Sequence, residues 1–180
     1  GGAATGKSTG AKMIAKKYNL KFLSSGLLYR YAGFLILKYR PINKVSFLKK
    51  KFKNLNYNKL NKINLHRPEI SEYSAKLAKI NGIRQILKKY QISFSNKYKN
   101  CCIEGRDIST KILPKSDVKF YFVCSLNIAS RRRFKELKRS NPKISISSDS
   151  RISFLIELFR INCSEVKLPI SFDSSSIFFL

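Results

Sequence analysis

The sequence predicts an α/β fold, a parallel sheet flanked by helices. Three observations support this: a glycine-rich phosphate-binding motif opens the chain, short apolar strand patterns alternate with helical ones, and 43% of the 180 residues are hydrophobic, enough for one core. No run of about 18 apolar residues is present that would predict a membrane span. We therefore expect a single domain over residues 1–180.

The first eight residues, G-G-A-A-T-G-K-S, match the phosphate-binding loop G-x-x-x-x-G-K-[ST] at every required position. Such a loop turns its backbone N–H groups toward nucleotide phosphates at the positive end of a helix. Lys7 would neutralise the β/γ-phosphate charge, and the Ser8 hydroxyl would hold Mg²⁺. The alternative, an ordinary glycine-rich turn, is disfavoured because the match runs directly into a helical pattern. The candidate phosphate-binding residues are Gly1, Gly2, Ala3, Ala4, Thr5, Gly6, Lys7, Ser8 and Thr9.

A loop of this kind normally follows a buried strand, whereas this sequence begins on the first glycine. We expect that strand to be missing from the record or from the gene. Because the central strand of a parallel sheet is buried on both faces, its loss is expected to be strongly destabilising.

Helix and strand patterns follow the loop in alternation. The expected elements are a helix with Ala11, Ile14, Ala15 and Tyr18 facing inward, a strand over 21–24, a helix over 26–39, a helix from Pro68 with Ile70, Tyr73, Leu77 and Ile80 inward, another helix after Gly82, strands over 100–104 and 118–124, a helix from about 125, a helical pattern over 154–161 and a last strand over 170–173. The Lys/Asn-rich stretch over 42–65 has irregular apolar spacing, which is consistent with a few strands or a poorly ordered insertion. Residues 145–153 are Ser-rich and predict a loop.

The net charge is +27, from 37 basic and 10 acidic residues. One interpretation is a surface for RNA or DNA. The other is codon bias, since Lys, Asn, Ile, Phe, Tyr and Ser are abundant, Trp is absent and the lysines are spread along the chain. We favour codon bias and expect no nucleic-acid partner. Four cysteines without a C-x-x-C pair and a single histidine make a zinc site improbable. Reduced thiols predict a cytoplasmic protein.

Several blocks of the sequence resemble bacterial cytidylate kinase, in the same order and at similar spacing. Besides the loop they are S-S-G-L-L-Y-R (24–30), R-P-E-I-S-E (67–72), E-G-R-D-I-S-T (104–110), L-P-K-S-D-V-K-F-Y (113–121) and A-S-R-R-R-F-K-E-L (129–137). The resemblance covers about residues 1–140. It implies the nucleoside monophosphate kinase fold, transfer of the γ-phosphoryl group of ATP to CMP or dCMP with Mg²⁺, a small CMP-binding insertion at 41–66 and an Arg-rich lid at 131–153.

The resemblance also implies roles for individual residues. Arg30 and Arg106 would grip the acceptor phosphate, Asp107 would accept from the cytosine amine, and Ser25 would lie beside the acceptor phosphate. The alternatives are a surface ion pair for Arg30, a turn cap for Asp107 and a helix N-cap for Ser25. The lid arginines would be Arg131, Arg132, Arg133 and Arg139; since consecutive helical residues point in different directions, one or two reach the phosphates, and we favour Arg132 or Arg133. The implied catalytic residues are Lys7, Arg106, Arg132 and Arg133.

The chain departs from the family pattern at several positions. Ser24 and Glu104 each stand where the family carries Asp, and His66 occupies the place of the base-reading arginine, with Arg67 next to it. Near the C-terminus Arg160 and Lys167 match the two basic positions of the ribose-binding run, while Ser164 replaces its Asp. The implied CMP-binding residues are Ser25, Arg30, His66, Arg67, Arg106, Asp107, Arg160 and Lys167.

Together these features predict a monomeric kinase of CMP or dCMP. Two alternatives remain open: another P-loop kinase of a small molecule, and a non-catalytic basic remnant that binds RNA through charge.

Overall fold

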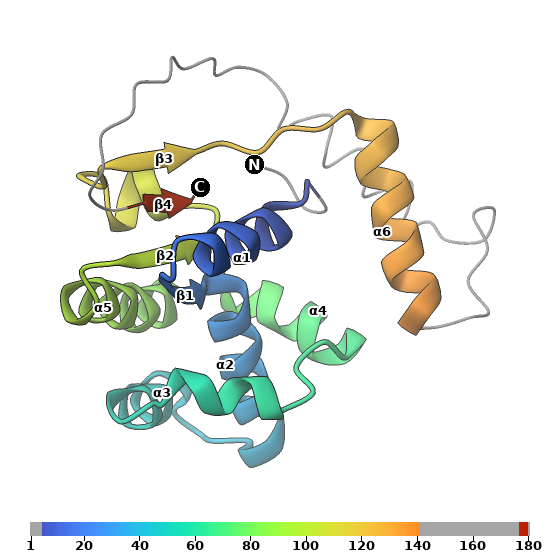
Figure 1. Cartoon of the computed structure of the whole chain (residues 1–180). Coiled ribbons are helices and arrows are strands. Elements are labelled where there is room, and N and C mark those ends of the chain that lie inside the picture. The colour runs from blue at the N-terminus through green and yellow to red at the C-terminus, as the bar shows by residue number, and fades with distance from the viewer. Residues whose placement is uncertain (1–4, 141–176, 180) are drawn as a thin grey trace.

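The computed structural model of the chain describes residues 5–140 and 177–179 (Figure 1). Its helices are α1 (Lys7–Lys17), α2 (Ser25–Tyr39), α3 (Lys44–Lys53), α4 (Pro68–Leu77), α5 (Asn81–Lys97) and α6 (Leu126–Ser140), with a 3-10 helix η1 (Tyr57–Lys62) and a short π-helical turn η2 (Ile108–Ile112). Its strands are β1 (Lys21–Ser24), β2 (Cys101–Glu104), β3 (Val118–Phe120) and β4 (Ile177–Phe179). The predicted α/β class is confirmed. The patterns predicted over 145–153, 154–161 and 170–173 lie outside the described residues.

The strands pair in parallel. β1 pairs with β2, which sets Ser24 opposite Glu104, and β3 pairs with β4. β4 lies between β2 and β3 and contacts both (Figure 1). The strand predicted over 118–124 is shorter than expected because its pairing ends where Phe120 meets Phe179. Since parallel strands end at a common edge, the residues that follow β1 and β2 lie beside each other.

Helices cover both faces of the β1–β2 pair, as its apolar sequence requires. On one face Cys102 packs with Ala11 and Ala15 of α1. On the other face Cys101 and Ile103 join the larger core, which α2, α3, α4 and α5 complete. Tyr18, predicted to face inward, is 53% exposed because α1 ends at Lys17 and Tyr18 is its C-cap.

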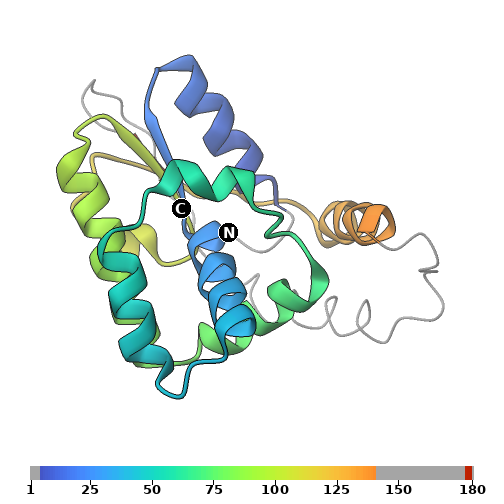
Figure 2. The ribbon, with the colours of Figure 1, turned by 90° about the horizontal axis from the view of Figure 1, so that it is seen from below.

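Helix α2 is the centre of the larger core. Leu28, Ala32, Leu35 and Ile36 are buried and form one helical stripe. The helix starts at the N-cap Ser24 and stops at Arg40, which takes a left-handed conformation before Pro41. It contacts α3, α4 and α5, which lie around it in the view of Figure 2.

The stretch over 42–65 is helical, so the prediction of strands or a poorly ordered segment is wrong. Asn43 caps α3 by accepting a hydrogen bond from the Ser46 N–H at 3.0 Å. Leu48 and Phe52, four residues apart, are buried against the core, and the lysines between them conceal this short stripe in the sequence. Within the described residues, no helix is long and apolar enough to cross a membrane.

The two buried thiols of β2 predict a loss of stability at alkaline pH. Burial raises the pKa of Cys101 from 9.0 to about 11, and burial with the nearby Cys101 and Glu104 raises that of Cys102 to about 12. The unfolded chain therefore loses these protons first, so stability present below pH 9.0 falls as the pH rises toward about 11. We expect the urea midpoint to fall from about pH 8 to about pH 10, and to fall less in a variant carrying Cys101→Ala and Cys102→Ala. Equal slopes in the two proteins would contradict the prediction.

Candidate nucleotide site

The phosphate-binding loop leads directly into α1, as predicted. Gly6 has a φ of +91°, a conformation that side chains other than glycine adopt only with strain, and it caps the helix. The Gly10 N–H donates to the Gly6 carbonyl at 2.9 Å, which closes the first turn. Ser8 and Thr9 lie in this turn and are exposed. Gly1, Gly2, Ala3 and Ala4 lie outside the described residues.

Lys7 is a buried ammonium at this helix start. Lys7 is only 7% exposed, and its Nζ donates a hydrogen bond to Thr5 Oγ1 at 3.1 Å. Burial lowers the pKa of Lys7, the Arg106 charge lowers it further, and Glu104 and Cys124 raise it. The structure thus brings Lys7, Glu104 and Arg106 into one electrostatic neighbourhood, although Arg106 follows Lys7 by about a hundred residues in the chain.

Glu104 is the carboxylate of this neighbourhood. It ends β2, is 7% exposed and accepts a hydrogen bond from Ser24 Oγ at 2.7 Å. Ser24 and Glu104, which both stand where the resemblance leads us to expect Asp, are therefore hydrogen-bonded to each other.

Gly105 lets β2 and α2 approach closely. A Cβ at this position would lie 2.6 Å from Ser25 Oγ and 2.9 Å from Ile108 side-chain carbons, so a larger residue would displace both. Ser25 is buried and donates to Gln91 Oε1 at 2.6 Å. Its hydroxyl proton is therefore engaged within the core.

Asp107 forms an ion pair with Arg84 of α5, at 2.7 Å between Oδ2 and Nη2. Tyr29 is close to both charges: burial raises the pKa of its phenol, Arg84 lowers it and Asp107 raises it. Arg84 was missed in the sequence, where α5 was interpreted only through its inward apolar residues. One sequence feature could have indicated Arg84. It is the one arginine of α5, whose other basic residues are lysines, and the composition of the chain favours lysine.

One of the arginines predicted for the lid lies beside the loop. Arg132 Nη1 lies 3.3 Å from the position that a Cβ of Gly6 would take, so its guanidinium lies beside the loop. Helix α6 stands next to the N-terminal end of α1 and apart from the sheet (Figures 1 and 2). Arg133 is half-buried on the same helix. This geometry favours Arg132 of the two predicted arginines.

For the other predicted site residues that it describes, the structure gives a position in the fold. Arg30 is half-buried on the second turn of α2. His66 and Arg67 are exposed before α4, and Arg67 forms an ion pair with Glu69. Arg160 and Lys167 lie outside the described residues.

The described residues contain no cluster of three His, Cys, Asp or Glu side chains that could hold a metal alone. Ser8 and Glu104 offer single oxygen ligands, which suits Mg²⁺ because it retains water and binds phosphate oxygens.

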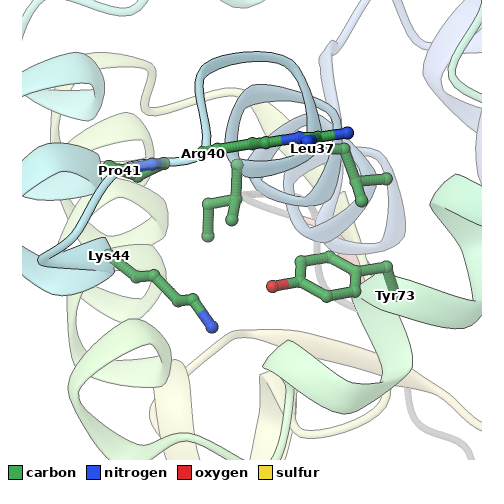
Figure 3. Close-up of a pocket in the computed structure, with 6 residues that line it drawn as sticks. Leu37, Arg40, Pro41, Lys44 and Tyr73 are labelled. Atoms are coloured by element: carbon green, nitrogen blue, oxygen red, sulfur yellow. The ribbon is translucent and has the colours of Figure 1, made fainter.

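A cavity of about 240 Å³ lies at the opposite end of α2, where it is lined by Ile36, Leu37, Arg40, Pro41, Lys44 and Tyr73 (Figure 3). No predicted site residue lines this cavity.

Known proteins resemble this chain over most of its length. Residues 1–149 match the family model described as cytidylate kinase. The chain is 33% identical over 138 residues to the cytidylate kinase of Bartonella quintana (strain Toulouse), a match that covers 76% of this chain and 64% of that protein. It is 33% identical over 142 residues to that of Bartonella tribocorum, again covering 64% of the relative, and 31% identical over 185 residues to that of Fusobacterium nucleatum, covering 82%. The chain thus spans slightly less than two thirds of the two Bartonella proteins.

Proposed function

The chain belongs to the cytidylate kinase family, and we therefore propose that it transfers the γ-phosphoryl group of ATP to CMP or dCMP, with Mg²⁺. The observation that carries this proposal is the convergence of Lys7, Arg106 and Arg132 at the phosphate loop. Phosphoryl transfer needs positioning and charge neutralisation more than proton transfer. Three cations around the start of one helix match that need.

At the donor end, the loop N–H groups and Lys7 bind the ATP phosphates, and Arg132 covers them from α6. Ser8 is the candidate ligand of Mg²⁺, which when bound neutralises charge on the β- and γ-phosphates. Arg133 remains a second candidate for contact with the phosphates. Residues 131–153 would form the lid to which both belong.

At the acceptor end, the Arg84–Asp107 pair suits the edge of cytosine. The carboxylate accepts from the exocyclic amine, and the guanidinium donates to the ring nitrogen and carbonyl oxygen. Uracil carries an acceptor in place of the amine, which would face the carboxylate without a hydrogen bond. We propose that this pair, rather than His66 or Arg67, selects the base.

Arg30 and Arg106 are the proposed grips on the acceptor phosphate, with Ser25 beside them. Arg160 and Lys167 stay candidates for the ribose and phosphate. We further propose that residues 41–66 are the CMP-binding insertion and that the kinase acts as a cytoplasmic monomer.

A panel of CMP, dCMP, UMP, AMP and shikimate with ATP–Mg²⁺ tests the function. We expect turnover of CMP or dCMP, with UMP disfavoured. Asp107→Asn, whose amide both donates and accepts, should reduce the preference for CMP over UMP by about tenfold or more. Preference for AMP would contradict the proposal, and binding of RNA with a steep salt dependence and no turnover would favour a non-catalytic protein.

A further inference from the structure

The cavity at the far end of α2 lies between three helices (Figure 3). Helices α2 and α4 approach closely at Gly33, where a Cβ would lie 3.3 Å from the Ile70 carbonyl oxygen. One turn further along α2, its last residues, the start of α3 and Tyr73 of α4 surround about 240 Å³. Ligand pockets commonly measure about 300–1,000 Å³, so this cavity suits a small organic molecule.

The polar groups of the cavity are two cations and a hydroxyl. The Arg40 side chain crosses one side, and the Lys44 ammonium and the Tyr73 hydroxyl point into the cavity from the other (Figure 3). Lys44 Nζ lies 6.0 Å from the centroid of the Tyr73 ring. In the described part of the chain neither cation forms an ion pair, and the Tyr73 hydroxyl makes no hydrogen bond. None of the lining residues is acidic, so these groups select an anion.

The positions of the two cations in their helices also favour a bound anion. Lys44 is the first residue of α3, and no acidic residue stands in the first turn of that helix. A cation is disfavoured at the positive end of a helix dipole, and an anion in the cavity would offset this effect. Arg40 follows the last residue of α2, where the dipole favours a cation, but it has a φ of +44°, a conformation in which glycine is usual. An arginine there brings a guanidinium to the cavity and keeps a strained backbone.

The rest of the cavity wall is apolar. Ile36 is 3% exposed, and Leu37 beside it is 39% exposed although it is a large apolar residue. The Pro41 ring and the Tyr73 ring add to this surface. Covering such a surface with an apolar group removes it from water, which favours binding. The ligand is therefore expected to carry an apolar body as well as a negative charge.

We propose that this cavity binds a small organic anion, a carboxylate or phosphate group on an aromatic or aliphatic body. Arg40 and Lys44 hold the charged group, since a guanidinium binds carboxylate and phosphate oxygens in the same way. The apolar body lies on Ile36 and Leu37. The inference does not rest on the proposed function, because no predicted site residue lines the cavity. Arg40 binds this ligand and takes no part in phosphoryl transfer.

Two-dimensional ¹H–¹⁵N NMR of the full chain at constant ionic strength tests the proposal. The ligands are phenyl phosphate, benzoate, inorganic phosphate and benzyl alcohol. We expect phenyl phosphate or benzoate to shift the amide signals of residues 36–44, and the tighter of the two identifies the preferred charged group. Inorganic phosphate lacks the apolar body and benzyl alcohol lacks the charge, so each should bind at least about tenfold more weakly.

Variants separate the cavity from a general attraction of anions to a basic chain. Arg40→Gln should weaken binding of the tighter ligand by about tenfold, and Lys44→Gln by about fivefold. Leu37→Asn should weaken it by about fivefold and leave inorganic phosphate unaffected. Lys50→Gln is the matched control, because Lys50 is an exposed lysine of α3 that does not line the cavity. Its binding should equal that of the wild type.

Several results would overturn the proposal: no shift of the amide signals of residues 36–44, wild-type binding in Arg40→Gln, an equal loss in Lys50→Gln, or inorganic phosphate binding as tightly as phenyl phosphate. Saturating CMP should not displace the ligand, and displacement would place the ligand at the proposed acceptor site instead. A chain that binds the ligand in the expected pattern but leaves CMP unphosphorylated would refute the proposed function alone.

Discussion

Replacing Lys7 with alanine should abolish phosphoryl transfer, with a loss of about a thousandfold or more in kcat/KM for ATP. Lys7 is buried at the start of α1, where its ammonium faces the loop and no other lysine is buried in the described residues. The charge that develops on the transferred phosphoryl group needs a fixed cation in a site with little water, where its effect is largest. Alanine removes that cation without creating a carboxylate or a bulky group.

Steady-state kinetics and far-UV circular dichroism measure this prediction. The spectrum should not change, because Lys7 serves the phosphate charge and not the apolar core, and burial, which lowers its pKa, disfavours the charged form. Lys12→Ala is the matched control, since Lys12 is exposed on the same helix and carries the same charge. Near-normal activity in Lys7→Ala would contradict the proposal that Lys7 and its loop bind the ATP phosphates.

Features that depend on neighbouring residues were predictable from the sequence. The start of α1 at Lys7 and the positive φ of Gly6 follow from the motif of the first eight residues. Strand β1 and the proline-led start of α4 also carry their own signals. The helices satisfy their backbone groups within a few residues of the chain, whereas β1 carries its own apolar pattern although it pairs with the distant β2.

Features that depend on distant residues were not predictable. The Arg84–Asp107 pair joins two side chains 23 positions apart, and neither the helix nor the turn reveals its partner. The choice of Arg132 beside Gly6 depends on how α6 is rotated relative to α1. The pairing of β4 with β3 depends on register between segments far apart in sequence. Such contacts are fixed by tertiary packing and not by local pattern.

The high positive charge of the chain makes its few carboxylates informative. The chain has 37 basic and 10 acidic residues. Codon bias can account for an abundance of lysine, but it does not account for the positions of the acidic residues. Glu104 and Asp107 both lie at the proposed site, and each is bonded to a specific partner, Ser24 and Arg84. The acids at and just after the end of β2 therefore mark the proposed site more clearly than the lysines do, which are spread along the chain.

The second large effect is expected at the acceptor end. Arg106→Ala should lower kcat/KM for CMP by about a thousandfold while the affinity for metal-free ATP changes by less than about threefold. Arg106 follows the closely packed Gly105, is exposed, and lies near enough to Lys7 for its charge to lower the Lys7 pKa. In the described part of the chain no carboxylate forms an ion pair with it. Two like charges held near each other are stabilised when a phosphate lies between them, and a guanidinium can bind that phosphate through two parallel hydrogen bonds.

Separate measurements at the two substrates decide where Arg106 acts. Arg106→Lys keeps the positive charge but loses the paired N–H donors of the guanidinium. We therefore expect its kcat/KM for CMP to lie between those of Arg106→Ala and the wild type. Arg40→Ala is the matched control, because Arg40 is an exposed arginine at the other end of α2, beside the cavity of Figure 3. Its kinetics should equal those of the wild type. Equal losses for ATP and CMP in Arg106→Ala would place this arginine at the donor phosphates, and the acceptor phosphate would then depend on Arg30, which starts from α2 and not from the end of β2.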